Sequence, residues 1–408
     1  MSEINGGARS PFEGGPYGIH HLPYGIFSTA DDPTRRIGVR IADQVLDLRA
    51  LDSEAVFAPQ IRAALASDSL NALMAAGPDA WRPVRSRITD LLASPDFGER
   101  ASRALTPIRR ARMHLPFAVA DYVDFYASEH HATNLGRLFR PDSEPLLPNW
   151  KRLPVGYHGR AGTVVASGTA IGRPSGQRRG AGGEIEFGPS RRLDIEAEVG
   201  FVVGAPSEAG TAVPADDFAE HVFGVVLVND WSARDIQAWE YQPLGPFLGK
   251  SFATSIGHWV TPLAALDAAK TAAPEQDPPP LAYLEESERF GYDLTLSVAW
   301  NGIEVSRPPF AQLYWTPAQQ LAHMTVNGAR LRTGDLYASG TVSGPEPGQY
   351  GSFIELTWGG SEPVRLGDGA ERTFLEDGDT VTIGATAPGL GGETIGLGEV
   401  TGTIAPAR

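Results

Sequence analysis

One segment of the chain, Val222 to Asp230, restricts the possible folds more than any other. Its sequence, VFGVVLVND, is a nearly continuous apolar run, which is typical of a β-strand buried on both faces. The run is far too short to span a bilayer. It ends in the polar pair Asn229 and Asp230, and α/β enzymes often place functional groups where a buried strand ends.

The residues after this strand predict a helix. Asp230 or Ser232 is a natural N-cap for a helix over residues 233–241. A helical period then puts three polar side chains on one face, Arg234, Gln237 and Tyr241. Asp230 is therefore either only a cap or a functional carboxylate beside that face.

The composition of the chain excludes several kinds of catalytic site and binding partner. The 408 residues predict two or three domains. Without any cysteine, the chain has no thiolate nucleophile and no sulfur ligand for zinc or iron. The net charge of -15 argues against a general affinity for nucleic acids or anionic membranes. The N-terminus is polar and Gly-rich with no signal-peptide core, so we expect a soluble cytoplasmic protein.

The first part of the chain reads as a small mixed unit. Residues 36–48 predict two strands around a turn, and residues 67–76 and 84–93 carry a helical period. The basic stretch 100–112, which includes Arg100, leads into the apolar sequence HLPFAV and is a plausible junction between two units. No catalytic constellation is evident before this junction.

A second strand carries three acidic residues. Residues 193–199 alternate strictly, so Asp194, Glu196 and Glu198 are expected on one face at steps of about 7 Å. Such a face is either solvated, with neighbouring arginines as counter-ions, or it holds a cation. Oxygen ligands suit a hard divalent cation such as Mg²⁺ or Ca²⁺. The candidate ligands are four carboxylates, Asp124, Glu196, Glu198 and Asp230, of which periodicity brings together only Glu196 and Glu198.

A candidate base lies near Asp124. Ser128 followed by Glu129 predicts a helix start, which places His131 in the first helical turn. The exposed N–H groups of that turn disfavour an imidazolium and keep His131 able to accept a proton. A purely structural role for the adjacent histidines His130 and His131 is the alternative.

Two further charged residues complete the candidates. The loop over residues 243–251 does not have the spacing of a phosphate loop, so Lys250 is better treated as a cation held close to a ligand. Residues 351–358 predict a strand with Glu355 between apolar neighbours. Glu355 either faces water or orients a histidine.

Longer segments of the chain resemble the fumarylacetoacetate hydrolase family. The resemblance extends in order over almost all of residues 115–408 and more loosely over the residues before them. It is carried by the segments DFYASEHHATNLGRLF, PNWKRLPVGYHGR, NDWSARDIQAWEYQPLGPFLGKSF, QDPPPLAYL, ASGTVSGPEPGQYGSFIELTW and FLEDGDTVTI.

The resemblance implies a mainly β fold with some α. Residues 1–115 would form an N-terminal SH3-like β-barrel domain, and residues 116–408 a catalytic, mixed β-roll domain of the fumarylacetoacetase type. It also implies a homodimer without nucleic-acid or membrane partners. The implied reaction is metal-dependent hydrolysis of the carbon–carbon bond of 4-fumarylacetoacetate to fumarate and acetoacetate, the last step of tyrosine and phenylalanine breakdown.

The same resemblance assigns site residues. It implies a metal, Mg²⁺ or Ca²⁺, on Asp124, Glu196, Glu198, Asp230, Lys250 and Thr254. It implies catalytic roles for His131, Glu355, Arg234, Gln237 and Lys250. It implies substrate contacts from Tyr126, Arg140, Tyr157, Tyr241 and Thr341. Two positions depart from the family pattern, His130 in place of Gln and Ala253 in place of Gly, and the first leaves the choice between His130 and His131 open.

Two other functions remain open at this stage. The same site would suit a related acylpyruvate or other β-diketone hydrolase, although the Tyr and Arg cluster favours a substrate with a distant carboxylate. A metal-binding scaffold without catalysis is the second alternative, but it has no need of His131, Glu355 and Lys250 together.

Overall fold

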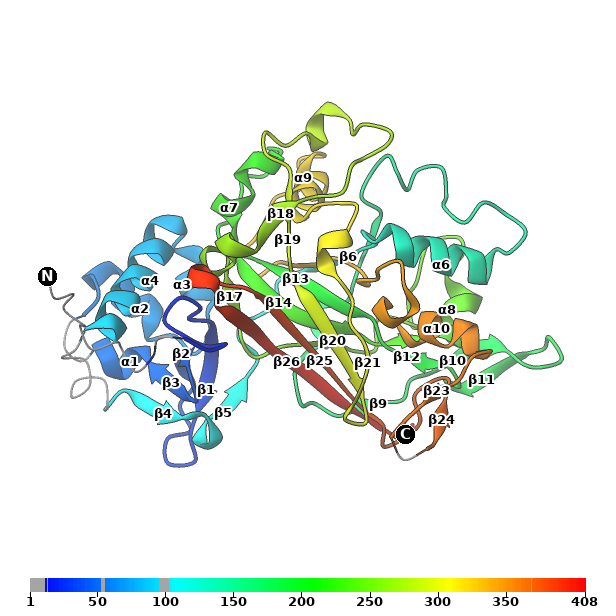
Figure 1. Cartoon of the computed structure of the whole chain (residues 1–408), viewed down its shortest axis with the longest axis horizontal. Helices are drawn as coiled ribbons and strands as arrows, with labels where there is room; N and C mark the ends of the chain where they lie inside the picture. The colour runs from blue at the N-terminus through cyan, green and yellow to red at the C-terminus, as the bar shows by residue number, and fades with distance from the viewer. Residues whose placement is uncertain (1–11, 13, 53–55, 95–102, 368) are drawn as a thin grey trace, which may run out of the picture.

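The computed structural model describes residues 12, 14–52, 56–94, 103–367 and 369–408, so Arg100 and most of the polar N-terminal segment lie outside it. Figure 1 shows the blue and cyan elements packed at one end of a larger assembly of green, yellow and red elements. No helix among the described residues is long and apolar enough to cross a membrane.

The N-terminal part is a small sheet covered by helices. Its strands lie in the order β4-β3-β2-β1-β5, with β1 Tyr24–Ser28, β2 Arg36–Ile41, β3 Gln44–Asp47, β4 Leu105–Pro107 and β5 Arg112–His114. Its helices are α1 Leu48–Leu51, α2 Pro59–Leu65, α3 Asn71–Ala75 and α4 Pro78–Ala93. The predicted strand pair over 36–48 is confirmed. The helix predicted from residue 67 begins only at Asn71, because the Leu70 amide donates to the carbonyl of Pro116.

A long curled sheet forms the centre of the molecule. Its order is β7-β6-β22-β13-β14-β16-β8, with β17 also paired to β14. The strands are β6 Tyr122–Phe125, β7 Gly156–His158, β8 Val164–Ala166, β13 Ala197–Val203, β14 Val222–Asp230, β16 Thr254–Ile256, β17 Thr261–Pro262 and β22 Leu336–Ala338.

A second sheet packs against the first. Its order is β21-β20-β25-β26-β9, with β9 Ile171–Gly172, β20 Thr295–Trp300, β21 Ile303–Ser306, β25 Thr380–Pro388 and β26 Thr394–Ala405. Short ladders join β10 Ser175–Arg179 to β11 Ile185–Pro189, β12 Leu193–Asp194 to β15 Ser232–Ala233, β18 Lys270–Ala272 to β19 Phe290–Tyr292, and β23 Val364–Arg365 to β24 Glu371–Arg372.

The strand predicted from the apolar run is buried on both faces, as expected. All residues of β14 are buried, with Val225 and Leu227 in the larger apolar core of the C-terminal part. Val226 and Val228, on the opposite face, share a second core with Ile26 of the N-terminal sheet. The N-terminal part therefore covers one face of the central sheet.

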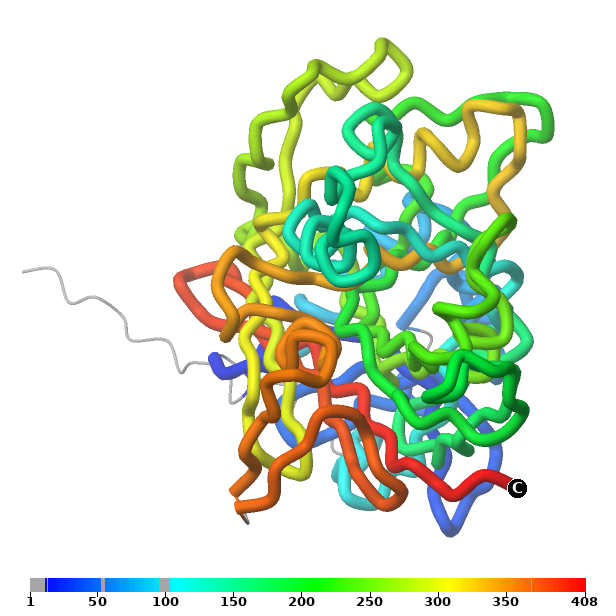
Figure 2. The backbone as a smooth tube through the Cα atoms, turned by 90° about the vertical axis from the view of Figure 1, so that its right-hand side faces the viewer, coloured from blue at the N-terminus to red at the C-terminus, as the bar shows by residue number. Residues whose placement is uncertain are grey.

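Helices at the far end of the central sheet surround the candidate residues. These are α6 Glu129–Phe139, α8 Arg234–Glu240 and α10 Phe353–Leu356, while α7 Phe218–His221 and α9 Pro317–Thr325 lie elsewhere on the sheet. In the side view of Figure 2, the orange turn that contains α10 lies next to the teal coil of α6. Both helices predicted at 129 and at 233–241 are confirmed.

Three local predictions were wrong. Residues 193–199 do not form one strand, because β12 pairs with β15, whereas the ladder with β14 belongs to β13 and begins at Ala197. The solvated alternative for that face is also wrong, since Asp194, Glu196 and Glu198 are all buried. Asp230 is not the cap of α8, whose N-cap is Ala233.

A fourth prediction was also wrong, since Glu355 lies in helix α10 and not in a strand. The amides of Phe353 and Ile354 donate to the carboxylate of Asp194 at 2.8 and 3.1 Å. This carboxylate satisfies the N–H groups that a helix start leaves free, and it comes from a strand far away in the sequence. The alternation of apolar residues around Glu355 could not predict this contact with Asp194.

Candidate active site

Four buried carboxylates converge at the end of the central sheet. One oxygen from each lies within 4.8 Å of the others, and we call this group the acidic cluster: Asp124, Glu196, Glu198 and Asp230. Asp124 lies on β6 and Asp230 ends β14, while Glu196 and Glu198 flank the start of β13. The antiparallel register pairs Glu198 with Val228, two residues before Asp230. Sheet pairing thus assembles a group that periodicity alone could not.

Several other side chains bind this cluster, among them Lys250, Thr254 and Tyr157. The Nζ atom of Lys250 donates to Glu196 Oε2 at 2.5 Å and to Asp230 Oδ2 at 2.6 Å. The Oγ1 atom of Thr254 donates to Asp230 Oδ1 at 2.9 Å. The hydroxyl of Tyr157 lies 2.9 Å from Asp124 Oδ2 and 3.0 Å from Asp230 Oδ2. Lys250 therefore compensates only part of the negative charge of the cluster.

The remaining carboxylate oxygens point to a cation. Oδ1 of Asp124 and both oxygens of Glu198 are buried and have no hydrogen-bond partner among the described residues. Buried polar atoms without partners are costly, and a buried carboxylate normally pairs with a donor or coordinates a metal. An all-oxygen set of this kind fits a hard divalent cation.

The electrostatics of Asp124 and Glu198 support the same interpretation. Burial and the carboxylates of Asp230 and Glu196 raise the pKa of Asp124 well above its usual value, against the opposing charge of Lys250. Burial and the other three carboxylates of the cluster raise the pKa of Glu198 in the same direction. A bound cation would favour the ionised form of both groups.

Glu196 and Lys250 behave as a charged pair. Burial alone would raise the pKa of Glu196, but the charges of Lys250, Arg234 and His131 hold it below its usual value. Burial likewise opposes the ammonium of Lys250, but Asp230 and Glu196 raise its pKa. Both groups are therefore ionised near neutral pH.

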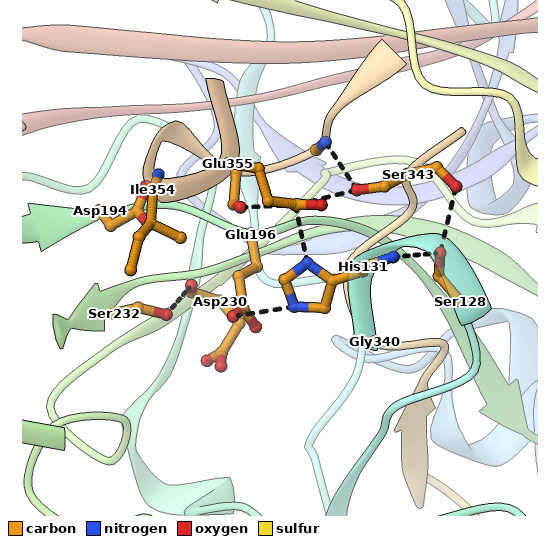
Figure 3. A network of polar contacts seen from close by, with 12 residues as sticks. Ser128, His131, Asp194, Glu196, Asp230, Ser232, Gly340, Ser343, Ile354 and Glu355 are labelled. Atoms are coloured by element: carbon orange, nitrogen blue, oxygen red, sulfur yellow. Dashed lines mark hydrogen bonds and ion pairs between the residues drawn. The ribbon is translucent and has the colours of Figure 1, made fainter. Parts of the chain in front are cut away.

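The second half of the site is a histidine held by a glutamate. Figure 3 shows His131 between Glu355 and Glu196, with Nδ1 2.7 Å from Glu355 Oε2 and Nε2 3.8 Å from Glu196 Oε1. The hydroxyl of Ser128 caps α6 by accepting from the His131 amide, as the sequence predicted. His130 does not line the cavity that His131 lines. The structure thus brings His131, rather than His130, to the acidic cluster.

Sequence reasoning missed the other donors to Glu355. Oε1 accepts from Asn134 Nδ2 at 3.0 Å, and Oε2 accepts from the hydroxyls of Ser343 at 3.0 Å and Ser352 at 2.7 Å. Burial would raise the pKa of Glu355, but His131 and these hydrogen bonds hold it below its usual range. Asn134 lies three residues after His131, so helical spacing carried a signal for it.

Arg234 links the acidic cluster to α8. Its Nη1 atom lies 2.7 Å from Glu196 Oε1 and donates to Gln237 Oε1 at 3.1 Å, while its Nε donates to Asp194 Oδ2 at 2.7 Å. Its Nη2 has no hydrogen-bond partner in the described part of the chain. Because Gln237 uses its oxygen to accept from Arg234, its amide nitrogen is left as a donor.

A cavity of about 400 Å³ opens beside these groups. This volume is within the range of small-molecule sites. The predicted site residues that line it are Asp124, Tyr126, His131, Arg140, Tyr157, Glu196, Arg234, Gln237, Tyr241 and Lys250. Glu198, Thr254 and Glu355 lie behind this wall. Thr341 is also buried away from the cavity lining, and its hydroxyl has no partner among the described residues.

Comparison with known families agrees with this geometry. Residues 20–116 match the family model described as Fumarylacetoacetase N-terminal, and residues 121–405 match the one described as Fumarylacetoacetate (FAA) hydrolase C-terminal. The second match alone spans more than half of the chain. The chain belongs to the fumarylacetoacetate hydrolase family. Its mixed, β-rich fold, with an N-terminal and a larger C-terminal part, is that of this family.

Relatives within the family match over nearly the whole chain. The fumarylacetoacetase of Caenorhabditis elegans is 48% identical over 405 residues, which cover 95% of this chain and 96% of that protein. The fumarylacetoacetases of Rattus norvegicus and Homo sapiens are 46% and 45% identical over 411 residues, covering 97% of each chain.

Solved structures share the fold at lower identity. A fumarylacetoacetate hydrolase from psychrophilic Exiguobacterium antarcticum has a TM-score of 0.56 at 16% identity, covering 95% of this chain and all of that one. A maleylpyruvate hydrolase from Sphingobium has a TM-score of 0.52 at 15% identity, covering 94% of this chain. These likenesses concern the fold.

Proposed function

We propose that the protein is a fumarylacetoacetase, which hydrolyses the carbon–carbon bond of 4-fumarylacetoacetate to fumarate and acetoacetate. The observation that carries this proposal is the meeting of the His131–Glu355 pair and the acidic cluster at one cavity. Full-length similarity to fumarylacetoacetases favours this substrate over an acylpyruvate. The reaction belongs to the breakdown of tyrosine and phenylalanine.

His131 is the proposed general base. A carboxylate can only accept, so the proton of the neutral imidazole lies on Nδ1 and is donated to Glu355. Nε2 is then the acceptor, and it faces the cavity side near Glu196. A water molecule placed there loses its proton to Nε2 as it attacks the carbonyl carbon.

Arg234, Gln237 and Lys250 are the proposed donors to the oxyanion and to the departing enolate. Arg234 keeps Nη2 unpaired, and Gln237 keeps its amide N–H groups. The ammonium of Lys250 has three donors, of which two bind the acidic cluster. Donors that are fixed before the reaction stabilise negative charge without reorganisation.

The acidic cluster is the proposed site of Mg²⁺ or Ca²⁺, with Lys250 and Thr254 bound to its carboxylates. When bound, the cation supplies a Lewis acid that polarises a chelated diketone. The chain's own part is to present the unpaired oxygens of Asp124, which lines the cavity, and of Glu198, which is buried behind the lining. The donor set does not distinguish between the two metals.

The cavity wall supplies the proposed substrate contacts. Tyr126, Tyr157 and Tyr241 offer hydroxyls, and Arg140 offers a guanidinium whose Nε has no partner among the described residues. This arginine suits the fumarate carboxylate of the substrate. Thr341 would contact substrate only through a shift of the wall, since it lies behind the lining.

The test is loss of the ultraviolet absorbance of fumarylacetoacetate with purified protein. We expect turnover that excess EDTA abolishes and that added Mg²⁺ or Ca²⁺ restores. Acylpyruvates with neutral tails are the comparison substrates and should react more slowly. Turnover of acylpyruvates alone, or full activity after removal of divalent metal, would overturn the proposal.

We also propose the finer organisation that the family implies. Residues 1–115 are taken as an SH3-like barrel domain, supported by the order β4-β3-β2-β1-β5, and residues 116–408 as the catalytic domain. A cytoplasmic location and a homodimer belong to the same proposal. The homodimer is supported by strongly exposed apolar side chains in β11 and after α8, namely Phe187, Leu244 and Phe247. Light scattering of the purified protein tests the dimer.

A further inference from the structure

Asp194 is a fully buried carboxylate outside the acidic cluster, and four donors converge on it. Oδ2 accepts from Arg234 Nε at 2.7 Å and from the amide of Ile354 at 3.1 Å. Oδ1 accepts from the amides of Phe353 at 2.8 Å and Ile195 at 2.7 Å. Figure 3 shows Asp194 beside Ile354, next to Glu355. Its exposed fraction is 0%, so water does not compete for these bonds.

These contacts join two separate elements. Ser352, the N-cap of α10, makes no capping bond with its own side chain, and Asp194 on β12 supplies the acceptor instead. A carboxylate at a helix start also opposes the partial positive charge of the free amides. Asp194 also accepts from the guanidinium of Arg234, the first residue of α8.

Helices α8 and α10, which Asp194 joins, are also linked through Oε1 of Glu196, α8 by Arg234 and α10 by way of His131. Arg234 Nη1 lies 2.7 Å from Glu196 Oε1, and His131 Nε2 lies 3.8 Å from the same oxygen. His131 is held there by Glu355, which is the residue after Ile354. The position of the proposed base relative to the proposed oxyanion donor therefore depends on a closed chain of contacts.

We propose that Asp194 is a positioning residue for the reaction: it fixes Arg234 and the Glu355-bearing turn relative to each other, so that donor and base face one point. This inference rests on the proposed function. Asp194 touches no reacting atom and acts through Arg234 and Glu355. An asparagine cannot replace it, because its amide N–H groups would face a site in which every neighbour donates.

The test compares Asp194→Asn with Asp379→Asn. Asp379 is also buried, accepts from the Glu376 amide at 2.8 Å and lies 3.9 Å from Arg372 Nε, but it lies outside the cavity. It therefore controls for the loss of a buried carboxylate that binds an amide near a guanidinium. We expect Asp194→Asn to lower kcat about 10–100-fold with KM nearly unchanged. Asp379→Asn should keep kcat.

Two further measurements separate positioning from stability. In hydrogen exchange, the peptide that spans residues 352–357 should lose protection in Asp194→Asn but not in Asp379→Asn. In a double-mutant cycle with Arg234→Lys, the losses in kcat should be far from multiplicative, since both changes remove the contact between Asp194 and the guanidinium of Arg234. A second cycle with Glu355→Gln tests whether Asp194 also acts through the contact between Glu355 and His131, in which case the losses should again be far from multiplicative.

The outcomes discriminate between the proposals. Multiplicative losses in both cycles, or unchanged exchange at residues 352–357, would overturn the role of Asp194. A kcat of Asp194→Asn equal to that of the wild type, per folded molecule, would overturn it as well. If the wild type does not hydrolyse fumarylacetoacetate, the proposed function fails instead, and the exchange experiment still decides whether Asp194 holds the Glu355 turn.

Discussion

The Nδ1 atom of His131 lies 2.7 Å from Oε2 of Glu355, although 224 positions separate the two residues in the sequence. Helix α6 presents the imidazole and helix α10 presents the carboxylate, and each side chain is buried. The contact fixes the tautomer, and with it the nitrogen that can take a proton. Four predictions follow from this site and from the way the two parts of the chain pack.

His131→Ala should lower kcat by at least about 100-fold, the usual minimum for a general base. His130→Ala should retain most activity, because His130 does not line the cavity. Steady-state kinetics checks both variants, and metal analysis should find the cation retained in each. Loss of activity in His130→Ala alone would reverse the assignment of the base.

Glu198→Gln should not lower the thermal stability of the metal-free protein, but it should lower the thermal stability of the protein with bound cation. Both oxygens of Glu198 are buried without a partner among the described residues, and burial raises its pKa well above the usual value. The neutral amide should therefore leave the melting temperature of the metal-free protein equal or higher. The stabilisation by Mg²⁺ or Ca²⁺, about 2.7 kcal/mol at 100 times Kd, should be lost.

Thermal unfolding with EDTA and with graded cation measures both effects of Glu198→Gln. The matched control is Glu286→Gln, a change in a glutamate outside the acidic cluster whose pKa burial raises to about 7. That control should leave the response to cation intact. Cation stabilisation of Glu198→Gln equal to that of the wild type would exclude Glu198 as a ligand.

Arg140→Leu should raise KM for fumarylacetoacetate about 10–100-fold, because a charge-assisted hydrogen bond contributes about 1.5–3 kcal/mol. Values of kcat/KM for acylpyruvates with neutral tails should change little. Arg137→Leu, one helical turn earlier and exposed, is the control. An equal loss with both substrate classes would mean that Arg140 does not recognise the distant carboxylate.

The elements that sequence patterns predicted correctly are those whose signal is local. The apolar run of β14, the Ser128 cap of α6 and the period of α8 need only neighbouring residues. The resemblance to a family, rather than periodicity, brought Asp124 and Asp230 together with Glu196. Their meeting depends on sheet pairing across distant strands, which spacing within one strand cannot encode.

The errors have the same physical origin. Residues 351–358 alternate like a strand, yet Asp194 caps a helix there from 160 positions away. Ser343 lies in Gly-rich sequence and Ser352 in the predicted strand over 351–358, and the role of both appears only in the fold, where each donates to Glu355. Local propensity is overridden where a buried long-range hydrogen bond must be satisfied.

His21 lies between the N-terminal part and the central sheet, and it should make the free energy of unfolding depend on pH. Nδ1 donates to the Pro16 carbonyl and Nε2 accepts from Thr261, each at 2.9 Å, and burial lowers the pKa of His21 from 6.5 to about 3. Below pH 6.5 His21 becomes protonated in the unfolded chain but stays neutral in the folded chain. Stability should therefore fall as the pH drops through 6.5, with a slope that approaches about 1.4 kcal/mol per pH unit well below that value. In urea unfolding between pH 7 and 5, the fall in stability should be smaller in His21→Gln than in the wild type and in the control His20→Gln. A fall in His21→Gln equal to that of the wild type would contradict the prediction.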